Sequence, residues 1–279
     1  MSSSIKLYKL PQGIYVEKED GSGYLDYDWD RLFQQEDLFS FLSDATLIER
    51  EADLEEALAP IGSQEVWACG VTYYSSRMAR EAESAAAGGG NFYTRVYAAE
   101  RPEIFFKATP QRVSGPGGSV RIRADSTWDV PEPELTLVIA ANGSIVGYTI
   151  GNDMSSRSIE GENPLYLPQA KTYEQCAALG PCIVVTPEPL KPTTEIRMII
   201  KRNSMVAFYG QCKLSDMKRT PEELRDYFLR ELEIPTGAFL MTGTGIVPDH
   251  DFTLQPKDEV NITIGPIGTL TTYVVRKDG

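Results

Sequence analysis

Two apolar segments joined by the dipeptide Asn142-Gly143 are the feature that most constrains the fold of this chain. Residues 135–141 precede this pair and residues 145–150 follow it. Because Asn-Gly favours the tight two-residue turn of a β-hairpin, the sequence predicts two antiparallel strands here. The turn also interrupts the longest uncharged run of the chain, residues 135–152, so this run is not expected to be a membrane helix.

Three acidic residues lie at the open end of the predicted hairpin. Glu132 and Glu134 stand two residues apart, and since side chains alternate along a strand, both carboxylates should point to the same face. Pro131 and Pro133 hold this segment extended. The return strand ends at Asp153, which the turn brings back towards the glutamates. Hard oxygen ligands of this kind suit Mg²⁺, with Mn²⁺ or Ca²⁺ as alternatives, although solvated carboxylates at a sheet edge would show the same spacing.

The motifs around these acidic residues resemble the metal site of the fumarylacetoacetate hydrolase superfamily. The matching runs are Pro131-Glu-Pro-Glu-Leu135, Gly147-Tyr-Thr-Ile-Gly-Asn-Asp153, Ser155-Ser-Arg157 and Lys171. Within the superfamily the closest resemblance is to the 2-keto-3-deoxy-D-arabinonate dehydratases. It is carried by Arg101-Pro-Glu-Ile-Phe-Phe-Lys-Ala-Thr-Pro110, Glu162-Asn-Pro-Leu-Tyr-Leu-Pro-Gln169 and Thr242-Gly-Thr-Gly-Ile-Val-Pro248, and it covers roughly residues 65 to 275.

The resemblance assigns expected roles to individual residues. Glu132, Glu134 and Asp153 would bind the metal, Lys171 would be the catalytic base, and Glu103, where the dehydratase also has a glutamate, would be the acid or an outer metal ligand. A lysine near a bound cation is pushed towards its neutral form, as a base requires, whereas the alternative is a structural lysine paired with a carboxylate. Glu103 could equally be a solvated residue before a strand.

Two further residues are candidates for binding the substrate. Arg157, four residues after Asp153, could grip a carboxylate with its guanidinium fork, or it could pair with Glu160 or Glu162. Ser158 stands where the family commonly has Asp, so the local orientation of Arg157 is left open. Thr244 lies between two glycines whose exposed N–H groups could cradle an anion, and a plain turn is the alternative.

The implied activity is metal-dependent dehydration of a 2-keto-3-deoxy sugar acid, such as 2-keto-3-deoxy-D-arabinonate or -xylonate, to 2,5-dioxopentanoate. The superfamily's hydrolases typically carry a His and Glu pair that activates water in the region after Val71. The only histidine of this chain is His250. The absence of a histidine from the region after Val71 favours dehydration over the alternatives, an acylpyruvate hydrolase or an oxaloacetate decarboxylase. A non-catalytic binding protein on the same fold is a further alternative, which the intact acidic set and Lys171 disfavour.

Composition excludes several classes of partner. The formal net charge of −13 argues against nucleic acid or an anionic membrane surface, since both favour clustered Lys and Arg. The four cysteines show neither a CxxC motif nor metal-ligand spacing, and the N-terminus shows no secretory signal, so a reduced, cytoplasmic protein is expected. The partner that the family resemblance implies is a small 2-keto acid.

The remaining segments predict a β-rich α+β protein in two parts. Residues 1–62 form a predicted small α/β domain, with strands near 7–10 and 14–16 and helices near 28–43 and 52–58. Residues 63–279 would form a mixed β-roll or barrel as in the fumarylacetoacetate hydrolase fold. Helices are predicted from Ser75 or Ser76 to Gly88 and from the capping box at Thr220 to about Glu233. The family resemblance and the separate N-terminal unit indicate a homodimer or homotetramer.

Overall fold

The predicted hairpin forms the centre of the protein in a computed structural model that describes residues 4–78 and 92–277. Its strands are β8 (Asp129–Ile139) and β9 (Ile145–Ser156), and both extend well beyond the apolar runs that predicted them. The register pairs Glu132 directly with Asp153. The acidic ends of the hairpin are therefore part of the strands, which gives their carboxylates a rigid backbone.

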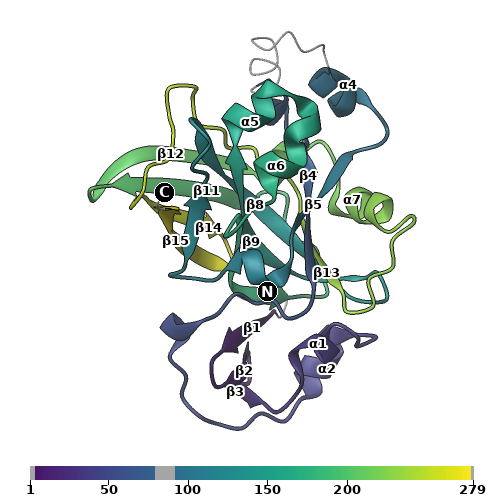
Figure 1. Cartoon of the computed structure of the whole chain (residues 1–279). Helices are drawn as coiled ribbons and strands as arrows, with labels where there is room; N and C mark the ends of the chain where they lie inside the picture. Colours follow the sequence, from purple (N-terminus) through teal and green to yellow (C-terminus); the bar gives the residue numbers. More distant parts are fainter. Residues whose placement is uncertain (1–3, 79–91, 278–279) are drawn as a thin grey trace.

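The strands form two sheets that pack face to face (Figure 1). The larger sheet has the order β3-β2-β1-β10-β9-β8-β13-β4-β5, with β6 also paired to β10. Besides the hairpin it contains β1 (Ile5–Leu10), β2 (Gly13–Lys18), β3 (Gly21–Leu25), β4 (Glu65–Gly70), β5 (Glu103–Ala108), β6 (Val113–Ser114), β10 (Ala177–Val185) and β13 (Ala238–Met241).

The smaller sheet has the order β12-β11-β14-β15-β7. Its strands are β7 (Ser119–Ile122), β11 (Glu195–Arg202), β12 (Met205–Lys213), β14 (Glu259–Ile264) and β15 (Gly268–Arg276). Among the described strands neither sheet closes on itself, so the roll rather than the barrel describes the architecture. The predicted β-rich α+β class is confirmed.

Both faces of the hairpin are covered by apolar side chains. Leu135 and Leu137 of β8 belong to the core between the two sheets, together with Met198 and Ile262 of the smaller sheet. Val138 points to the opposite face and belongs to a second core. Since alternate residues of one strand serve different cores, β8 is buried along its whole length.

The N-terminal segment extends the larger sheet. β1 pairs antiparallel with β10, and β2 and β3 follow it outward. Two short helices, α1 (Trp29–Leu32) and α2 (Leu38–Asp44), replace the single helix predicted over residues 28–43, because Asp37 caps a new helix by accepting a hydrogen bond from the Ser40 N–H. The helix predicted near residues 52–58 is a single 3₁₀ turn, η1 (Leu54–Glu56). The boundary at residue 62 between two domains stays a prediction.

The other helices lie near the ends of the central strands. They are α4 (Phe92–Ala98), α5 (Arg157–Glu162), α6 (Leu167–Lys171) and α7 (Pro221–Phe228), with the 3₁₀ turns η2 (Pro110–Arg112), η3 (Pro164–Tyr166) and η4 (Leu214–Asp216). Thr220 caps α7 as predicted, but the helix ends at Phe228 rather than near Glu233. A helix is present at residues 74–78, so Ser75 and Ser76 lie inside it and do not cap it as predicted. Its predicted continuation to Gly88 lies outside the described residues. None of the described helices is long and apolar enough to cross a membrane.

The first residue of β8 provides a test of how deeply this strand is buried. Asp129 is 3% exposed, and burial raises its pKa from 3.8 to about 6, against the opposing effect of the Ser126 hydrogen bond. Because the folded protein binds the Asp129 proton more tightly than the unfolded chain does, protonation of Asp129 stabilises the fold below about pH 4. This stabilisation is lost as the pH rises through about 6. We expect wild-type stability to fall between pH 4 and 7, relative to Asp129→Asn, by roughly 1–3 kcal/mol.

Urea unfolding of both proteins across this pH range measures the difference. Asp125→Asn is the control, because the Arg123 hydrogen bond lowers the pKa of Asp125 and the pH dependence should have the opposite sign. Parallel pH profiles for the wild type and Asp129→Asn would contradict the expectation.

Candidate metal centre

The three predicted metal ligands come together on one face of the hairpin. Oxygen atoms of Glu132, Glu134 and Asp153 all lie within 4.8 Å of one another. The hairpin register explains this, because Glu132 faces Asp153 across the strands and Glu134 is the next residue on the same face. The three side chains are 5%, 1% and 1% exposed, which excludes the alternative of solvated carboxylates at a sheet edge.

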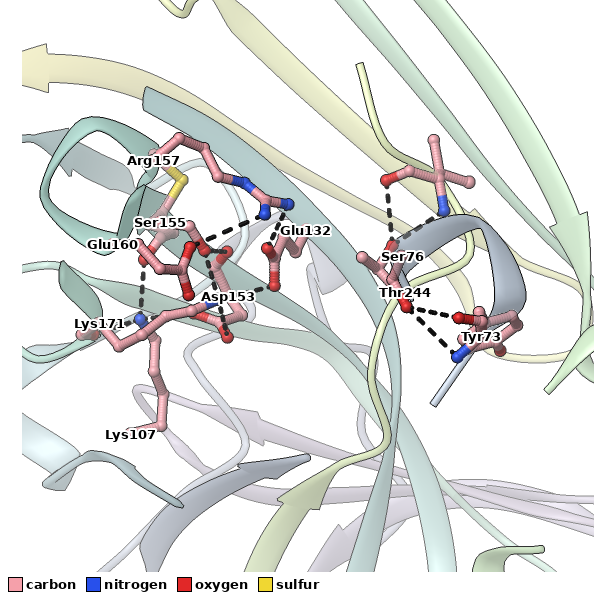
Figure 2. A network of polar contacts seen from close by, with 12 residues as sticks. Tyr73, Ser76, Lys107, Glu132, Asp153, Ser155, Arg157, Glu160, Lys171 and Thr244 are labelled. Carbon is pink, nitrogen blue, oxygen red and sulfur yellow. Dashed lines mark hydrogen bonds and ion pairs between the residues drawn. The ribbon is translucent and has the colours of Figure 1, made fainter. Parts of the chain in front are cut away.

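Lys171 bridges two of these carboxylates. Its Nζ donates to Glu132 Oε2 at 2.8 Å and to Asp153 Oδ2 at 2.9 Å, and also to Ser155 Oγ at 2.6 Å. The short helix α6 positions it, with Pro168 in the first turn and Lys171 as the last residue. Figure 2 shows its side chain reaching the acidic group from beside the hairpin. The lysine predicted to be the base thus lies directly against the predicted metal ligands.

A second lysine, Lys107, was not identified from the sequence. Its Nζ lies 2.6 Å from Asp153 Oδ1, donates to the Met154 carbonyl at 2.8 Å and also donates to the Lys171 carbonyl, and the residue is 0% exposed. β5 supplies it, from a position facing the hairpin (Figure 2). The sequence does indicate a buried lysine here, because a single charged residue interrupts the apolar run Ile-Phe-Phe-Lys-Ala. A buried lysine requires a carboxylate partner.

Arg157 contacts the acidic group from the opposite side. Its guanidinium lies 2.7 Å from Glu132 Oε1 and 3.7 Å from Glu160 Oε2, so the predicted pairing with Glu160 is present together with a closer one to Glu132. Ser156 caps α5, which begins at Arg157. The Ser158 hydroxyl, where the family commonly has Asp, bonds to the Ser126 hydroxyl at 2.9 Å and so anchors this helix to the segment before β8.

Glu134 differs from the other two carboxylates. Its Oε2 accepts a hydrogen bond from the Gly243 N–H at 2.5 Å, but within the described part of the chain it forms no ion pair. Burial and the charges of Asp153 and Glu132 raise the pKa of Glu134 well above its usual range, while Lys171 lowers it. The ionised form of Glu134 is therefore disfavoured unless a positive charge is added beside it. A hard divalent cation fits this donor set.

The two remaining predicted site residues lie at the margin of the group. Glu103 is the first residue of β5, on the same face as Lys107, and its carboxylate lies against Gly70 of β4, where a Cβ atom would be 2.0 Å from Glu103 Oε2. The Thr244 hydroxyl bonds to the backbone of Ile246, and it lies apart from the acidic group in Figure 2. The loop that carries Thr244 contacts the acidic group through the hydrogen bond from the Gly243 N–H to Glu134.

Comparison with known proteins identifies the family. The model of the fumarylacetoacetate (FAA) hydrolase C-terminal domain matches residues 66–275. The chain belongs to the fumarylacetoacetate hydrolase family. Within it, the chain is 49% identical over 233 residues to the probable 2-keto-3-deoxyxylonate dehydratase of Haloferax volcanii, covering 83% of this chain and 79% of that protein. It is 46% identical over 220 residues to the 2-dehydro-3-deoxy-D-arabinonate dehydratase of Saccharolobus solfataricus, covering 78% and 74%.

A solved structure of this family shows the same fold over almost the whole chain. It is a 2-keto-3-deoxy-D-arabinonate dehydratase complexed with magnesium and 2,5-dioxopentanoate. The two structures superpose with a TM-score of 0.85 at 36% identity, covering 99% of this chain and 100% of that one. Since this coverage is almost complete, the described N-terminal strands and helices are part of the shared fold.

The contacts of Lys107 predict a large structural effect. Lys107→Met would leave Asp153 Oδ1 and two carbonyl groups without their donor in a buried site, so we expect a loss of about 3–5 kcal/mol in unfolding free energy. Lys201→Met is the control, because Lys201 is 42% exposed in its ion pair with Glu259 and should contribute less than about 1 kcal/mol. Urea unfolding measures both, and equal losses would show that Lys107 is not required to balance the charge of Asp153.

Proposed function

We propose that this protein catalyses the dehydration of a 2-keto-3-deoxy sugar acid, such as 2-keto-3-deoxy-D-arabinonate or -xylonate, to 2,5-dioxopentanoate. The observation that carries the proposal is the buried group of three carboxylates with Lys171 against it, in a chain 46–49% identical to two dehydratases of these substrates. The protein is then a hydro-lyase of pentose catabolism, and a cytoplasmic location agrees with its four free cysteines.

Glu132, Glu134 and Asp153 would hold one divalent cation, Mg²⁺ in the first instance. When bound, it supplies positive charge next to the carboxylate and 2-keto oxygens of the substrate, which makes the hydrogens on C3 more acidic. The hairpin keeps the three carboxylates in place without the cation, because Lys171, Lys107 and Arg157 already neutralise two of them.

Lys171 takes the proton from C3 in this proposal. Its Nζ lies against two of the proposed ligands, so a base would stand beside a substrate held at this site. A divalent cation on the same carboxylates would compete with the lysine ammonium for their oxygens, and this favours the neutral amine. The Ser155 hydroxyl, 2.6 Å away, holds the amine in register.

Glu103 donates a proton to the C4 hydroxyl, which leaves as water. The C3–H and C4–O bonds break and a C3=C4 double bond forms. Removal of a proton from C5 and protonation at C3 shift the unsaturation to an enol at C4 and C5, and protonation at C4 gives the terminal aldehyde. Arg157 and the Thr244 loop would hold the carboxylate end of the substrate, which requires Arg157 to share its guanidinium between Glu132 and the substrate.

The alternatives within the family receive less support. Hydrolysis of an acylpyruvate needs a group that activates water, and the only histidine of the chain, His250, contacts Trp128 with 5.2 Å between ring centroids. Decarboxylation of oxaloacetate would use the same cation, and the product distinguishes it from dehydration.

Removing any one ligand should abolish turnover. We expect Glu132→Ala, Glu134→Ala and Asp153→Ala to lose activity on 2-keto-3-deoxypentonates, and EDTA to inactivate the wild type until Mg²⁺ is restored. Metal analysis of each protein and an assay of a panel of 2-keto-3-deoxy sugar acids, acylpyruvates and oxaloacetate measure this. Full activity of protein shown to be metal-free would refute the role of the cation.

The proton-transfer roles predict different kinetic effects. Lys171→Ala should lower kcat by about 10²-fold or more with little change in KM, whereas Arg157→Ala should mainly raise KM. In D₂O, promptly trapped product should carry deuterium at the former C3 and C4 positions. Near-normal turnover by Lys171→Ala, or formation of pyruvate by C–C cleavage, would contradict the mechanism.

We also propose that the protein assembles as a homodimer or homotetramer, as closed symmetric assemblies are the commonest oligomers. Light scattering at micromolar concentration should then report a multiple of the 30.9 kDa chain mass. A mass equal to one chain would exclude such an assembly.

A further inference from the structure

A pocket of about 460 Å³ lies between α7 and strands β4 and β5. Its apolar wall includes Trp67 and Ile104 of the strands and Phe228 of α7. The rings of Trp67 and Phe228 contact each other at a tilt of 58°, with 5.5 Å between their centroids. This volume falls in the range of small-molecule sites, and the planar indole of Trp67 in the wall suits a planar ligand.

Two arginines line the same pocket. The guanidinium of Arg230 lies 3.6 Å from the ring centroid of Tyr227, and that of Arg101 lies 5.7 Å from it. Tyr227 is itself held in place by donating its hydroxyl hydrogen to Glu100 Oε1 at 2.9 Å. Cation–π contacts fix a guanidinium without using its N–H donors, so both groups remain available to an acceptor.

The charge of the pocket is not balanced by ion pairs. Among the residues that the structure describes, neither Arg101 nor Arg230 forms a salt bridge, although the chain has 40 acidic residues against 27 basic ones. Glu231 also lines the pocket, which leaves one net positive charge. In a protein of net charge −13, this is a local site that favours an anion.

The pocket and the metal centre lie on opposite faces of β5. Alternate residues of this strand face opposite sides, with Ile104 in the pocket and Lys107 on Asp153. Arg101 is joined to Glu103, the proposed acid, through the rigid residue Pro102. Figure 1 shows β5 between α7 on one side and α6 on the other. A ligand that moves Arg101 would therefore move the start of the strand that carries Glu103.

We propose that this pocket binds a small planar organic carboxylate, gripped by Arg101 and Arg230 and stacked on the Trp67 wall, and that its occupation changes turnover through β5. The binding itself does not depend on the proposed function, whereas the effect on turnover rests on it. The bidentate arginine forks recognise the carboxylate, and the aromatic wall recognises the planar body.

Benzoate is the probe, with benzamide as a neutral molecule of the same shape and acetate as an anion without the planar body. Binding to the Mg²⁺-loaded full-length protein is measured by ligand-observed NMR and by calorimetry. We expect benzoate to bind at least about ten-fold more tightly than benzamide or acetate, since charge-assisted hydrogen bonds contribute this much. Arg101→Gln and Arg230→Gln should each weaken benzoate binding by about ten-fold.

Two control variants locate the site. Arg225→Gln, on α7 but already paired with Asp226, should leave benzoate binding unchanged. Glu134→Gln, at the metal centre, should also leave it unchanged, even if that variant has no activity. Binding that is lost in Glu134→Gln but retained in Arg101→Gln would place benzoate at the metal centre and overturn the proposal, as would equal affinity for benzoate and benzamide.

The coupling is tested by kinetics. Saturating benzoate should change kcat or KM of the wild type by about two-fold or more, and should have no effect on the Arg101→Gln, Arg230→Gln double variant. The same change in both proteins would show competition at the metal centre, and binding without any change in turnover would refute the coupling through β5.

Discussion

The structure depends on balancing three carboxylates that are buried within 4.8 Å of one another. Like charges at this distance in a dry site are strongly unfavourable unless cations neutralise them. Lys171, Lys107 and Arg157 come from α6, β5 and the start of α5, so the charge balance joins three segments to one hairpin. Glu134 lacks such a partner among the described residues, and its raised pKa marks where a divalent cation fits.

The sheet arrangement makes this charge group possible. β8 and β9 contribute one apolar core on each face, so the hairpin is held rigidly between the smaller sheet and the N-terminal helices. Serine hydroxyls then fix the helix that carries Arg157, through the contacts of Ser126 with Ser156 and Ser158. The family's dehydratase in complex with magnesium and 2,5-dioxopentanoate has this same fold. Apart from Thr244, the site residues thus lie on strands and short helices.

β5 connects two different environments. It carries Lys107 and Glu103 on the side of the metal centre, and Ile104 on the side of the arginine-lined pocket. Because β5 lies at the end of the larger sheet and pairs only with β4 among the described strands, its start is less constrained than the central hairpin. A ligand in the arginine-lined pocket would therefore act through β5. It would affect the proposed acid, Glu103, more than the proposed metal ligands on the hairpin.

Local sequence determined the hairpin and its acidic group, because an Asn-Gly turn, period-two alternation and flanking prolines act within about 25 residues of one another. Local sequence also determined the Thr220 cap of α7 and the family motifs. Lys107 was missed because a lysine in a strand has a partner only once Asp153, 46 residues later, lies beside it. The joining of β1 to β10 and the pairing of Arg157 with Glu132 were likewise decided by tertiary structure, since contacts between distant segments follow from packing and charge balance rather than from local preference.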